Sequence, residues 1–323
     1  MHRIRFSAFM VAVIAVTGAH AQSPAPFPSK PIELVVHTAP GGGTDLVARM
    51  VGDILTREKL VNQPVNIANR AGGGGAIAYS YIRSKRGEPH TVMTVASMSL
   101  LTQTMRPELK LGLENYTPIA FLAQDPQAIM VSASSPYKTL KDLVEAARRE
   151  PNTLVASITS PGGTGRLLVW LLERETGTRY RSVSFKSGSD AIMQVMGGHT
   201  HFSTENISEA HASVEAKKVR VLAVTSRTRM PLVPDAPTMI ELGYNIHVGT
   251  GRGFVMPADV PKEAAAHMES LLERVYRSPA WKEFAERNMF ENIWMGSAEY
   301  GKHLAERRVL VGEFMQAVGL APK

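Results

Sequence analysis

The sequence IELVVHTAPGGGTD, residues 32–45, indicates the fold class of this protein most directly. Residues 32–37 form a short, mostly apolar run, which is typical of a strand buried in a parallel sheet. A glycine-rich turn follows at residues 40–45, and apolar residues then recur at helical spacing from Leu46 to Leu55. A strand, a turn and an amphipathic helix in this order begin a βαβ unit, so we predict α/β layers.

The same alternation continues along the chain. Further buried strands are predicted from apolar runs at residues 65–68, 91–96, 154–158 and 219–224. A capping box that begins at Thr139 predicts a helix, and a second capping-box pair, Thr238 and Glu241, predicts a short helix ending at Gly243. Helical spacing of apolar residues persists near the C-terminus, at residues 268–276 and 300–318.

The composition narrows the class of protein. The 323 residues suit two domains, and 44% hydrophobic with 20% charged residues is typical of globular rather than disordered chains. The absence of cysteine excludes disulfides, zinc–thiolate sites and iron–sulfur clusters. The net charge of +7 favours anionic ligands, but no dense run of lysine and arginine is present, so we expect no nucleic-acid partner.

Residues 1–21 have the three parts of a secretory signal. Arg3 and Arg5 make its start positive, and the apolar residues 6–16 are too few to span a membrane. The small-residue motif Ala19-His20-Ala21 predicts cleavage after Ala21 and an exported mature protein. A disordered terminus or an uncleaved N-terminal anchor is the alternative interpretation.

Three glycine-rich turns, at residues 40–45, 69–76 and 160–165, are each expected to follow a strand and open a helix. The start of a helix exposes unpaired backbone N–H groups and the positive end of the helix dipole. Glycine allows a ligand to approach this backbone closely, so such a turn can bind an anion without a charged side chain. Hydroxyl groups that could donate to a carboxylate oxygen are those of Thr44, Ser160 and Thr164.

No nucleotide-binding or catalytic motif accompanies these turns. None ends in the Gly-Lys-Ser/Thr of a P-loop, and the dinucleotide pattern counted from Gly41 fails because Leu46 occupies the third glycine position. The chain has no G-x-S-x-G elbow and no H-E-x-x-H pair, and His199 and His201 lack an evident third metal ligand. The sequence therefore predicts no catalytic residue, no metal site and no cofactor.

Several motifs resemble the Bug/TctC family, the extracytoplasmic solute-binding proteins of tripartite tricarboxylate transporters. They occur in the family's order across nearly the whole mature chain, and their combination is more specific than any one of them. The matching segments are KPIELVV at 30–36, PGGGTD at 40–45, NRAGG at 69–73, SPGGT at 160–164, and PDAPT at 234–238 followed by ELG at 241–243.

The resemblance implies a two-domain periplasmic binding protein of the Venus-flytrap type, type II-like, in which each domain is a β-sheet flanked by helices. Domain 1 is expected to be discontinuous, with residues 22–123 plus 248–323, and domain 2 to contain residues 124–247. The chain would cross between them near residues 122–127 and 247–251. The first two glycine turns would then face the third across a cleft.

The resemblance also implies a function. The protein would capture a small carboxylate, such as a di- or tricarboxylate or an aromatic acid, in the periplasm and deliver it as a monomer to integral-membrane permease subunits. The residues expected to bind the ligand are Pro40, Gly41, Gly42, Gly43, Thr44, Asp45, Asn69, Ser160, Gly162, Gly163, Thr164, Lys186, Glu205, Asn206 and Arg252.

Three segments depart from the family's pattern and concern the identity of the ligand. The family's Tyr-Lys-Gly is replaced by FKSG at 185–188, which keeps Lys186 but loses the aromatic hydroxyl. Glu205 and Asn206 stand where Asp-Asn or Asp-Ser is common, and Arg252 lies where a tryptophan is common. Because a guanidinium binds carboxylate in a bidentate way, Arg252 is expected to meet a second ligand carboxylate.

Two alternatives remain open at this stage. Asp45 could serve as the base of an extracytoplasmic hydrolase or lyase, although an Asp in the first turn of a helix is more often a cap. The protein could also be a ligand-sensing subunit that docks on a receptor kinase rather than on a permease.

Overall fold

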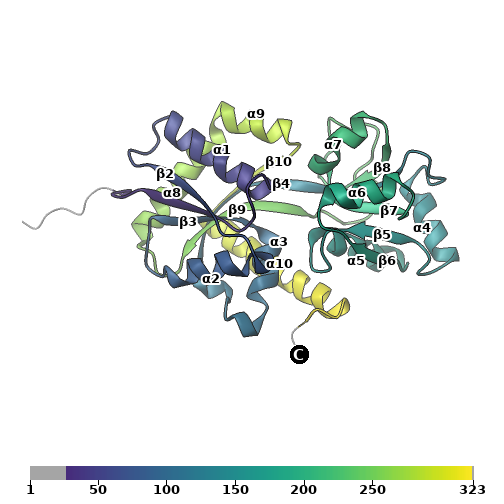
Figure 1. The fold of residues 1–323 in the computed structure, drawn as a ribbon, viewed down its shortest axis with the longest axis horizontal. Helices are drawn as coiled ribbons and strands as arrows, with labels where there is room; N and C mark the ends of the chain where they lie inside the picture. The colour runs from purple at the N-terminus through teal and green to yellow at the C-terminus, as the bar shows by residue number, and fades with distance from the viewer. Residues whose placement is uncertain (1–26, 322–323) are drawn as a thin grey trace, which may run out of the picture.

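The long strand β4 (Tyr116–Ser132) organises the fold, because its two halves belong to different lobes (Figure 1). In the computed structural model, which describes residues 27–321, residues 116–126 of β4 pair antiparallel with β9 (Gly249–Pro257). From Gln127 onward β4 pairs with β7 (Phe202–Asn206) and β8 (Val219–Val224). The partners of β4 thus change within the region predicted for the first crossing; the predicted leader, 1–21, lies outside the described residues.

The first lobe combines N-terminal strands with C-terminal helices. Its strands β1, β2 and β3 are parallel, and Val36 at the end of β1 lies opposite Asn69 and Thr94. Its strands, besides β9 and the first half of β4, are β1 (Ile32–Val36), β2 (Val65–Asn69), β3 (Thr91–Ala96) and β10 (Glu291–Gly296). Its helices are α1 (Gly43–Arg57), η1 (Gly73–Gly75), α2 (Ala76–Ser84), α3 (Ser97–Thr104), η2 (Pro107–Leu109), η3 (Leu113–Asn115), α8 (Lys262–Arg277), α9 (Pro279–Arg287) and α10 (Ser297–Ala317).

The second lobe repeats the α/β plan on the other half of β4. Parallel strands β5 and β6 lie beside β7, with Ala156 opposite both Ser182 and Phe202. Its additional strands are β5 (Val155–Ile158) and β6 (Arg181–Ser184). Its helices are α4 (Leu140–Arg149), α5 (Thr164–Thr176), α6 (Gly188–Met196) and α7 (Ile207–Glu215).

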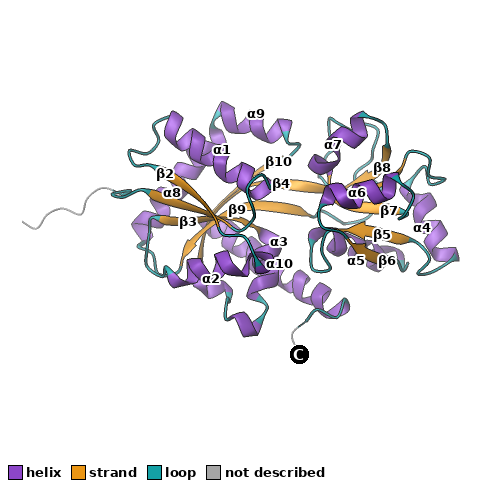
Figure 2. Ribbon diagram, viewed as in Figure 1, coloured by secondary structure: helices purple, strands orange, loops and turns teal. Residues whose placement is uncertain are grey.

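Helices cover both faces of each sheet (Figure 2). In the first lobe, α1, α8 and α9 pack on one face around the fully buried Trp281, and α2, α3 and α10 pack on the other around Tyr79 and Tyr300. In the second lobe, α6 and α7 lie on one face, and α4 and α5 on the other. The end of α10 also reaches α5, where the rings of Phe314 and Trp170 lie 5.9 Å apart.

This architecture places strand ends from both lobes around one space. The carboxyl ends of parallel strands meet at the same edge of a sheet, and loops there carry binding groups in α/β proteins. His37 directly follows β1, and Ala96 is the last residue of β3. Thr159 directly follows β5, and Glu205 lies near the end of β7. All four line the cavity between the lobes, so the topology brings together segments far apart in the sequence.

Most of the predicted elements are confirmed, and one is wrong. The five predicted strands appear as β1, β2, β3, β5 and β8 to within one residue, and the Thr139 capping box opens α4. Thr238 and Glu241 also exchange both capping-box hydrogen bonds, but no helix follows them. Gly243, with a left-handed φ of +85°, ends the segment after a single turn. Within the described chain, no helix is long and apolar enough to cross a membrane.

Candidate functional site

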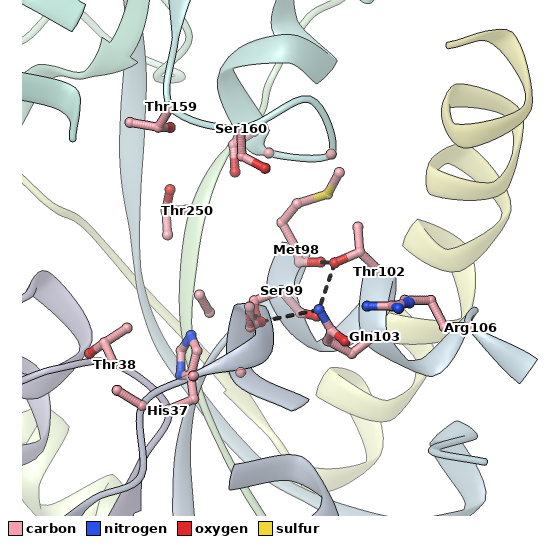
Figure 3. Close-up of a pocket in the computed structure, with 18 of the residues that line it drawn as sticks. His37, Thr38, Met98, Ser99, Thr102, Gln103, Arg106, Thr159, Ser160 and Thr250 are labelled. Carbon is pink, nitrogen blue, oxygen red and sulfur yellow. Dashed lines mark hydrogen bonds between the residues drawn. The ribbon is translucent and has the colours of Figure 1, made fainter. Parts of the chain in front are cut away.

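Two connected chambers lie between the lobes, and together they form the candidate site. The outer cavity has a volume of about 880 Å³ and is lined from the first lobe by α3 and the 72–75 turn, and from the second by the 160–164 turn (Figure 3). The inner chamber has a volume of about 240 Å³ and shares residues such as His37, Thr159 and Thr250 with the outer cavity. These volumes are sufficient for a small organic ligand.

The 160–164 turn presents the start of α5 to this space. Gly163, the residue before the helix, is extended and provides no side-chain cap, so the first backbone N–H groups of α5 are free of side-chain partners. Ser160, Gly162 and Gly163 line the outer cavity, and Thr164 lines both chambers. The turn is therefore a ready site for an anionic group.

Some residues of the 40–45 turn line the inner chamber, and others hold the turn in shape. Gly43 and Thr44 line the inner chamber, where a Cβ added at Gly43 would lie 2.7 Å from Nη2 of Arg252. Asp45 is 1% exposed, and its carboxylate accepts 2.8 Å hydrogen bonds from Gly41 N, Arg49 Nε and Asn69 Nδ2. Asp45 thus braces the turn rather than lining either chamber.

The electrostatics of Asp45 agree with this bracing role. Burial alone would raise the pKa of Asp45, but the hydrogen bonds from Arg49, Gly41 and Asn69 together hold it below its ordinary value. The carboxylate is therefore ionised and fully engaged at neutral pH. A side chain held in this way is poorly suited to accept a proton from a ligand.

The second glycine turn and the start of α3 form one wall of the outer cavity, and sequence reasoning missed the contribution of α3. Gly72 to Gly75 all have left-handed φ values, and Gly72, Gly74 and Gly75 line the outer cavity. Ser99 and Gln103 on α3 donate to the carbonyl oxygen of Gly74 at 3.2 Å and line the cavity beside it (Figure 3). One signal could have identified α3: it begins directly after a buried strand, β3, and the glycine turns that line the cavity also follow strands.

Arg252 lines the inner chamber, but it already has an anionic partner. Its Nη2 lies 2.7 Å from Oδ2 of Asp125, and both side chains are almost fully buried. The same Asp125 oxygen accepts from Asn206 Nδ2 at 2.8 Å and from Ser208 Oγ at 2.9 Å. Asp125, which sequence reasoning missed, neutralises the guanidinium that was expected to meet a second ligand carboxylate.

Two glutamates complete the inner chamber. Glu205 is 4% exposed, and burial, with a further contribution from Glu209, raises its pKa to about 8. Burial and the nearby Asp125 also raise the pKa of Glu209. Thr159 Oγ1 donates to Oε2 of Glu205 at 3.4 Å, whereas Oε1 has no hydrogen-bond partner within the described structure.

The imidazole of His37, which lines both chambers, is neutral at physiological pH. Burial is the main cause that lowers the pKa of His37 to about 4, and the positive charge of Arg252 acts in the same direction. The neutral imidazole can exchange hydrogen bonds with a ligand but adds no charge to the site.

The structure thus separates the predicted site residues into two groups. Those that line one or both chambers are Gly43, Thr44, Ser160, Gly162, Gly163, Thr164, Lys186, Glu205, Asn206 and Arg252. Those that do not line them are Pro40, Gly41, Gly42, Asp45 and Asn69. Between residues 27 and 321, no group of three or more His, Asp or Glu side chains is arranged to hold a metal ion.

Known proteins share this fold and sequence pattern. BugT of Bordetella pertussis is 27% identical over 243 residues, which cover 73% of this chain and 74% of BugT. A TctC solute-binding protein from Polaromonas, solved without ligand, superposes with a TM-score of 0.76 at 26% identity, covering 90% of this chain and 99% of that one.

A second solved structure carries a ligand. The R. palustris protein Rpa4515, solved with adipate, superposes with a TM-score of 0.75 at 24% identity and covers 92% of this chain and all of its own. These likenesses confirm the expected two-lobed periplasmic-binding-protein fold. The model of the tripartite tricarboxylate transporter family receptor, TctC, matches residues 47–320. The chain therefore belongs to the TctC family of solute-binding receptors.

Proposed function

We propose that this protein binds a small carboxylate between its lobes and delivers it to the membrane subunits of a tripartite tricarboxylate transporter. The observation that carries the proposal is the uncapped start of α5, which faces the outer cavity with the hydroxyl groups of Ser160 and Thr164 beside it. The related fold of Rpa4515 was solved with adipate, a carboxylate. The neutral His37 and the exposed backbone of the 72–75 turn complete a polar site opposite.

The two-lobed architecture supports capture by closure. Both chambers are lined from both lobes, so a bound ligand contacts the two of them at once. A ligand that makes contacts in a closed state and loses them in an open one shifts the population toward closure. The extended strands β4 and β9, which connect the lobes, are the segments where such a movement would be absorbed.

The location and assembly are part of this proposal. The signal at residues 1–21, with cleavage after Ala21, would deliver a monomeric receptor to the periplasm. A hydrolase or lyase is less well supported, because Asp45, its candidate base, is engaged by three hydrogen bonds away from both chambers. Delivery to a receptor kinase would use the same ligand site, so only the membrane partner distinguishes sensing from transport.

A thermal-shift screen of carboxylates on the mature protein tests the proposal. A ligand at 100 times its dissociation constant should raise the free energy of unfolding by about 2.7 kcal/mol. Small-angle scattering with a ligand found in this way should show a smaller radius of gyration than without it. Failure of every carboxylate to stabilise the protein would refute the proposed function, and an unchanged radius at saturation would refute closure.

A further inference from the structure

The inner chamber holds more acidic than basic side chains. Among the described residues that line it, Arg252 supplies the positive charge, and Asp125 is its ion-pair partner at 2.7 Å. Glu205 and Glu209 also line the chamber, and neither forms an ion pair with any described residue. A second ligand carboxylate placed here would face two acidic groups and a guanidinium that is already neutralised.

The two glutamates converge on one place. They approach each other over Gly188, where an added Cβ would collide with Oε2 of Glu209 and lie 3.2 Å from Oε2 of Glu205. The remaining oxygen of Glu205, Oε1, is buried and has no hydrogen-bond donor within residues 27–321. A buried carboxyl oxygen without a hydrogen-bond partner is costly, and a ligand that donates a hydrogen bond there would remove this cost.

The anion-binding turn lies directly beside these glutamates. Thr159, the residue before the turn, donates to Glu205, and Thr164 at the start of α5 lines the same chamber as Glu205. If a ligand binds the turn through its carboxylate, another group of the same ligand can therefore reach Glu205. No metal-binding cluster exists among the described residues, so an organic donor fits the glutamates better than a metal ion does.

We propose that Glu205, assisted by Glu209, binds a cationic nitrogen and makes this receptor select aminocarboxylates over dicarboxylates. This inference rests on the proposed function, because the 160–164 turn is taken to hold the ligand's carboxylate. A buried carboxylate that meets an ammonium group forms a charge-assisted hydrogen bond, which is among the stronger polar contacts in proteins. A dicarboxylate of equal length offers no cation, so it would bind only while Glu205 stays protonated and would lack this charge-assisted contact.

Proton release provides a signature of this contact. The pKa of about 8 leaves Glu205 mostly protonated at pH 7, and an ammonium group bound to it would favour the ionised form. Binding at pH 7 should therefore release about one proton, and affinity should rise about tenfold per pH unit below pH 7 and level off above pH 8. The other charged or titratable groups on the surrounding elements are Glu209 on α7, Asp125 on β4, Arg252 on β9, His37 after β1 and Lys186 before α6.

Matched ligand pairs test the selection. In each pair, an ammonium group replaces one carboxylate of the dicarboxylate. The pairs are glycine and malonate, β-alanine and succinate, 4-aminobutyrate and glutarate, and 5-aminopentanoate and adipate. Thermal shift and calorimetry on the mature wild type, with ligands up to about 10 mM to include weak complexes, should show that an aminocarboxylate binds more tightly than its dicarboxylate partner. Calorimetry at pH 7 in two buffers of different ionisation enthalpy measures the proton release.

Variants assign the effect to the glutamate. Glu205→Gln should weaken the preferred aminocarboxylate about 30-fold or more, abolish the proton release, and leave the dicarboxylate partner unchanged or tighter. Glu209→Gln should reduce the preference less, because the buried oxygen without a hydrogen-bond partner belongs to Glu205. Glu145→Gln, on the exposed side of α4, is the matched control and should change neither ligand. An unchanged thermal midpoint and circular dichroism spectrum of each variant show that it is folded.

The outcomes separate the two proposals. Tighter binding of dicarboxylates, or aminocarboxylate binding that Glu205→Gln leaves unchanged, would overturn the role of Glu205 while supporting the proposed function. Binding of no ligand in either series would overturn the role of Glu205, and it would overturn the proposed function as well when the wider carboxylate screen also finds no ligand. A preference that persists in Glu205→Gln without proton release would place the ammonium group elsewhere and equally overturn the inference.

Discussion

Replacing Arg252 by methionine would remove the cation from a carboxylate that is 1% exposed. Asp125 would lose the 2.7 Å contact to Nη2 and keep its hydrogen bonds from Asn206 and Ser208, while its Oδ1 has no partner in the described structure. Breaking one side of a buried ion pair costs about 3–5 kcal/mol, because the remaining charge stays desolvated. We therefore expect Arg252→Met to lower the free energy of unfolding by about that amount at pH 7.

The pH dependence of this loss follows from the carboxyl group. Burial raises the pKa of Asp125 in the native state, and the loss of Arg252, which lowers it, would raise it further. A native state that binds more protons than the unfolded state loses stability as the pH rises. The deficit of Arg252→Met should therefore be smaller near pH 4 than at pH 7, because protonation of Asp125 relieves the unpaired charge.

Urea denaturation followed by circular dichroism measures these differences. The double variant Asp125→Asn, Arg252→Met removes both charges and should recover a large part of the loss, giving a coupling energy of about 2 kcal/mol or more. Arg277→Met is the matched control, because its exposed pair with Glu273 is worth only about 0.3–0.5 kcal/mol. A loss below about 1 kcal/mol for Arg252→Met, with no coupling to Asp125, would show that the guanidinium is free for a ligand and would refute the pairing.

Three further predictions concern the turns and the acid range. Thr164→Ala should weaken the carboxylate found in the screen by about 0.5–1.5 kcal/mol, measured by calorimetry, since one neutral hydrogen bond is lost. Gly43→Ala should destabilise the protein by about 1–3 kcal/mol in urea, because the added Cβ would lie 2.7 Å from Arg252 Nη2. Burial, with the charges of Arg307 and His247, lowers the pKa of His303 to about 4 from 6.5, so its contribution to stability is present above pH 6.5 and is lost as the pH falls toward 4. Urea curves of His303→Gln should consequently lose less stability over this range than the wild type.

Each of these predictions has a control or a contradicting result. Thr153→Ala, at an exposed hydroxyl outside both chambers, should leave ligand affinity unchanged. Gly301→Ala, whose nearest atom to the new Cβ lies at 3.8 Å, should be neutral or stabilising in α10. Equal effects of Gly43→Ala and Gly301→Ala would contradict the close approach of Arg252. Parallel acid profiles of His303→Gln and the wild type would contradict the buried neutral imidazole.

Local patterns in the sequence were sufficient for the strands and for the turns that follow them. A buried parallel strand is a continuous apolar run, and glycine clusters mark the sharp turn into the next helix, so residues 32–45 predicted β1 and the start of α1. The capping box at Thr139 worked for the same reason, because its two hydrogen bonds lie within one helical turn. The failure at Thr238 shows the limit of such motifs, since Gly243 stopped the helix after one turn.

The lining of the candidate site was only partly predictable. The 160–164 turn and Gly43 line the chambers, whereas Asp45 and Asn69, although part of the same motifs, bind each other behind the turn. Motif membership does not distinguish a side chain that meets the ligand from one that holds the motif in shape. The wall of α3 was missed because its residues carry no glycine cluster.

The sequence by itself determined the α/β class, the family and the positions of the glycine turns, because these depend on residues close together in the chain. Only the tertiary structure decided the charge of the inner chamber. Asp125 and Arg252 are 127 residues apart and meet because β4 and β9 pair antiparallel between the lobes. Burial then gives Glu205 its raised pKa and leaves Oε1 without a donor. Desolvation and ion pairing depend on what surrounds a side chain in space, and that environment is set by the crossing of distant strands.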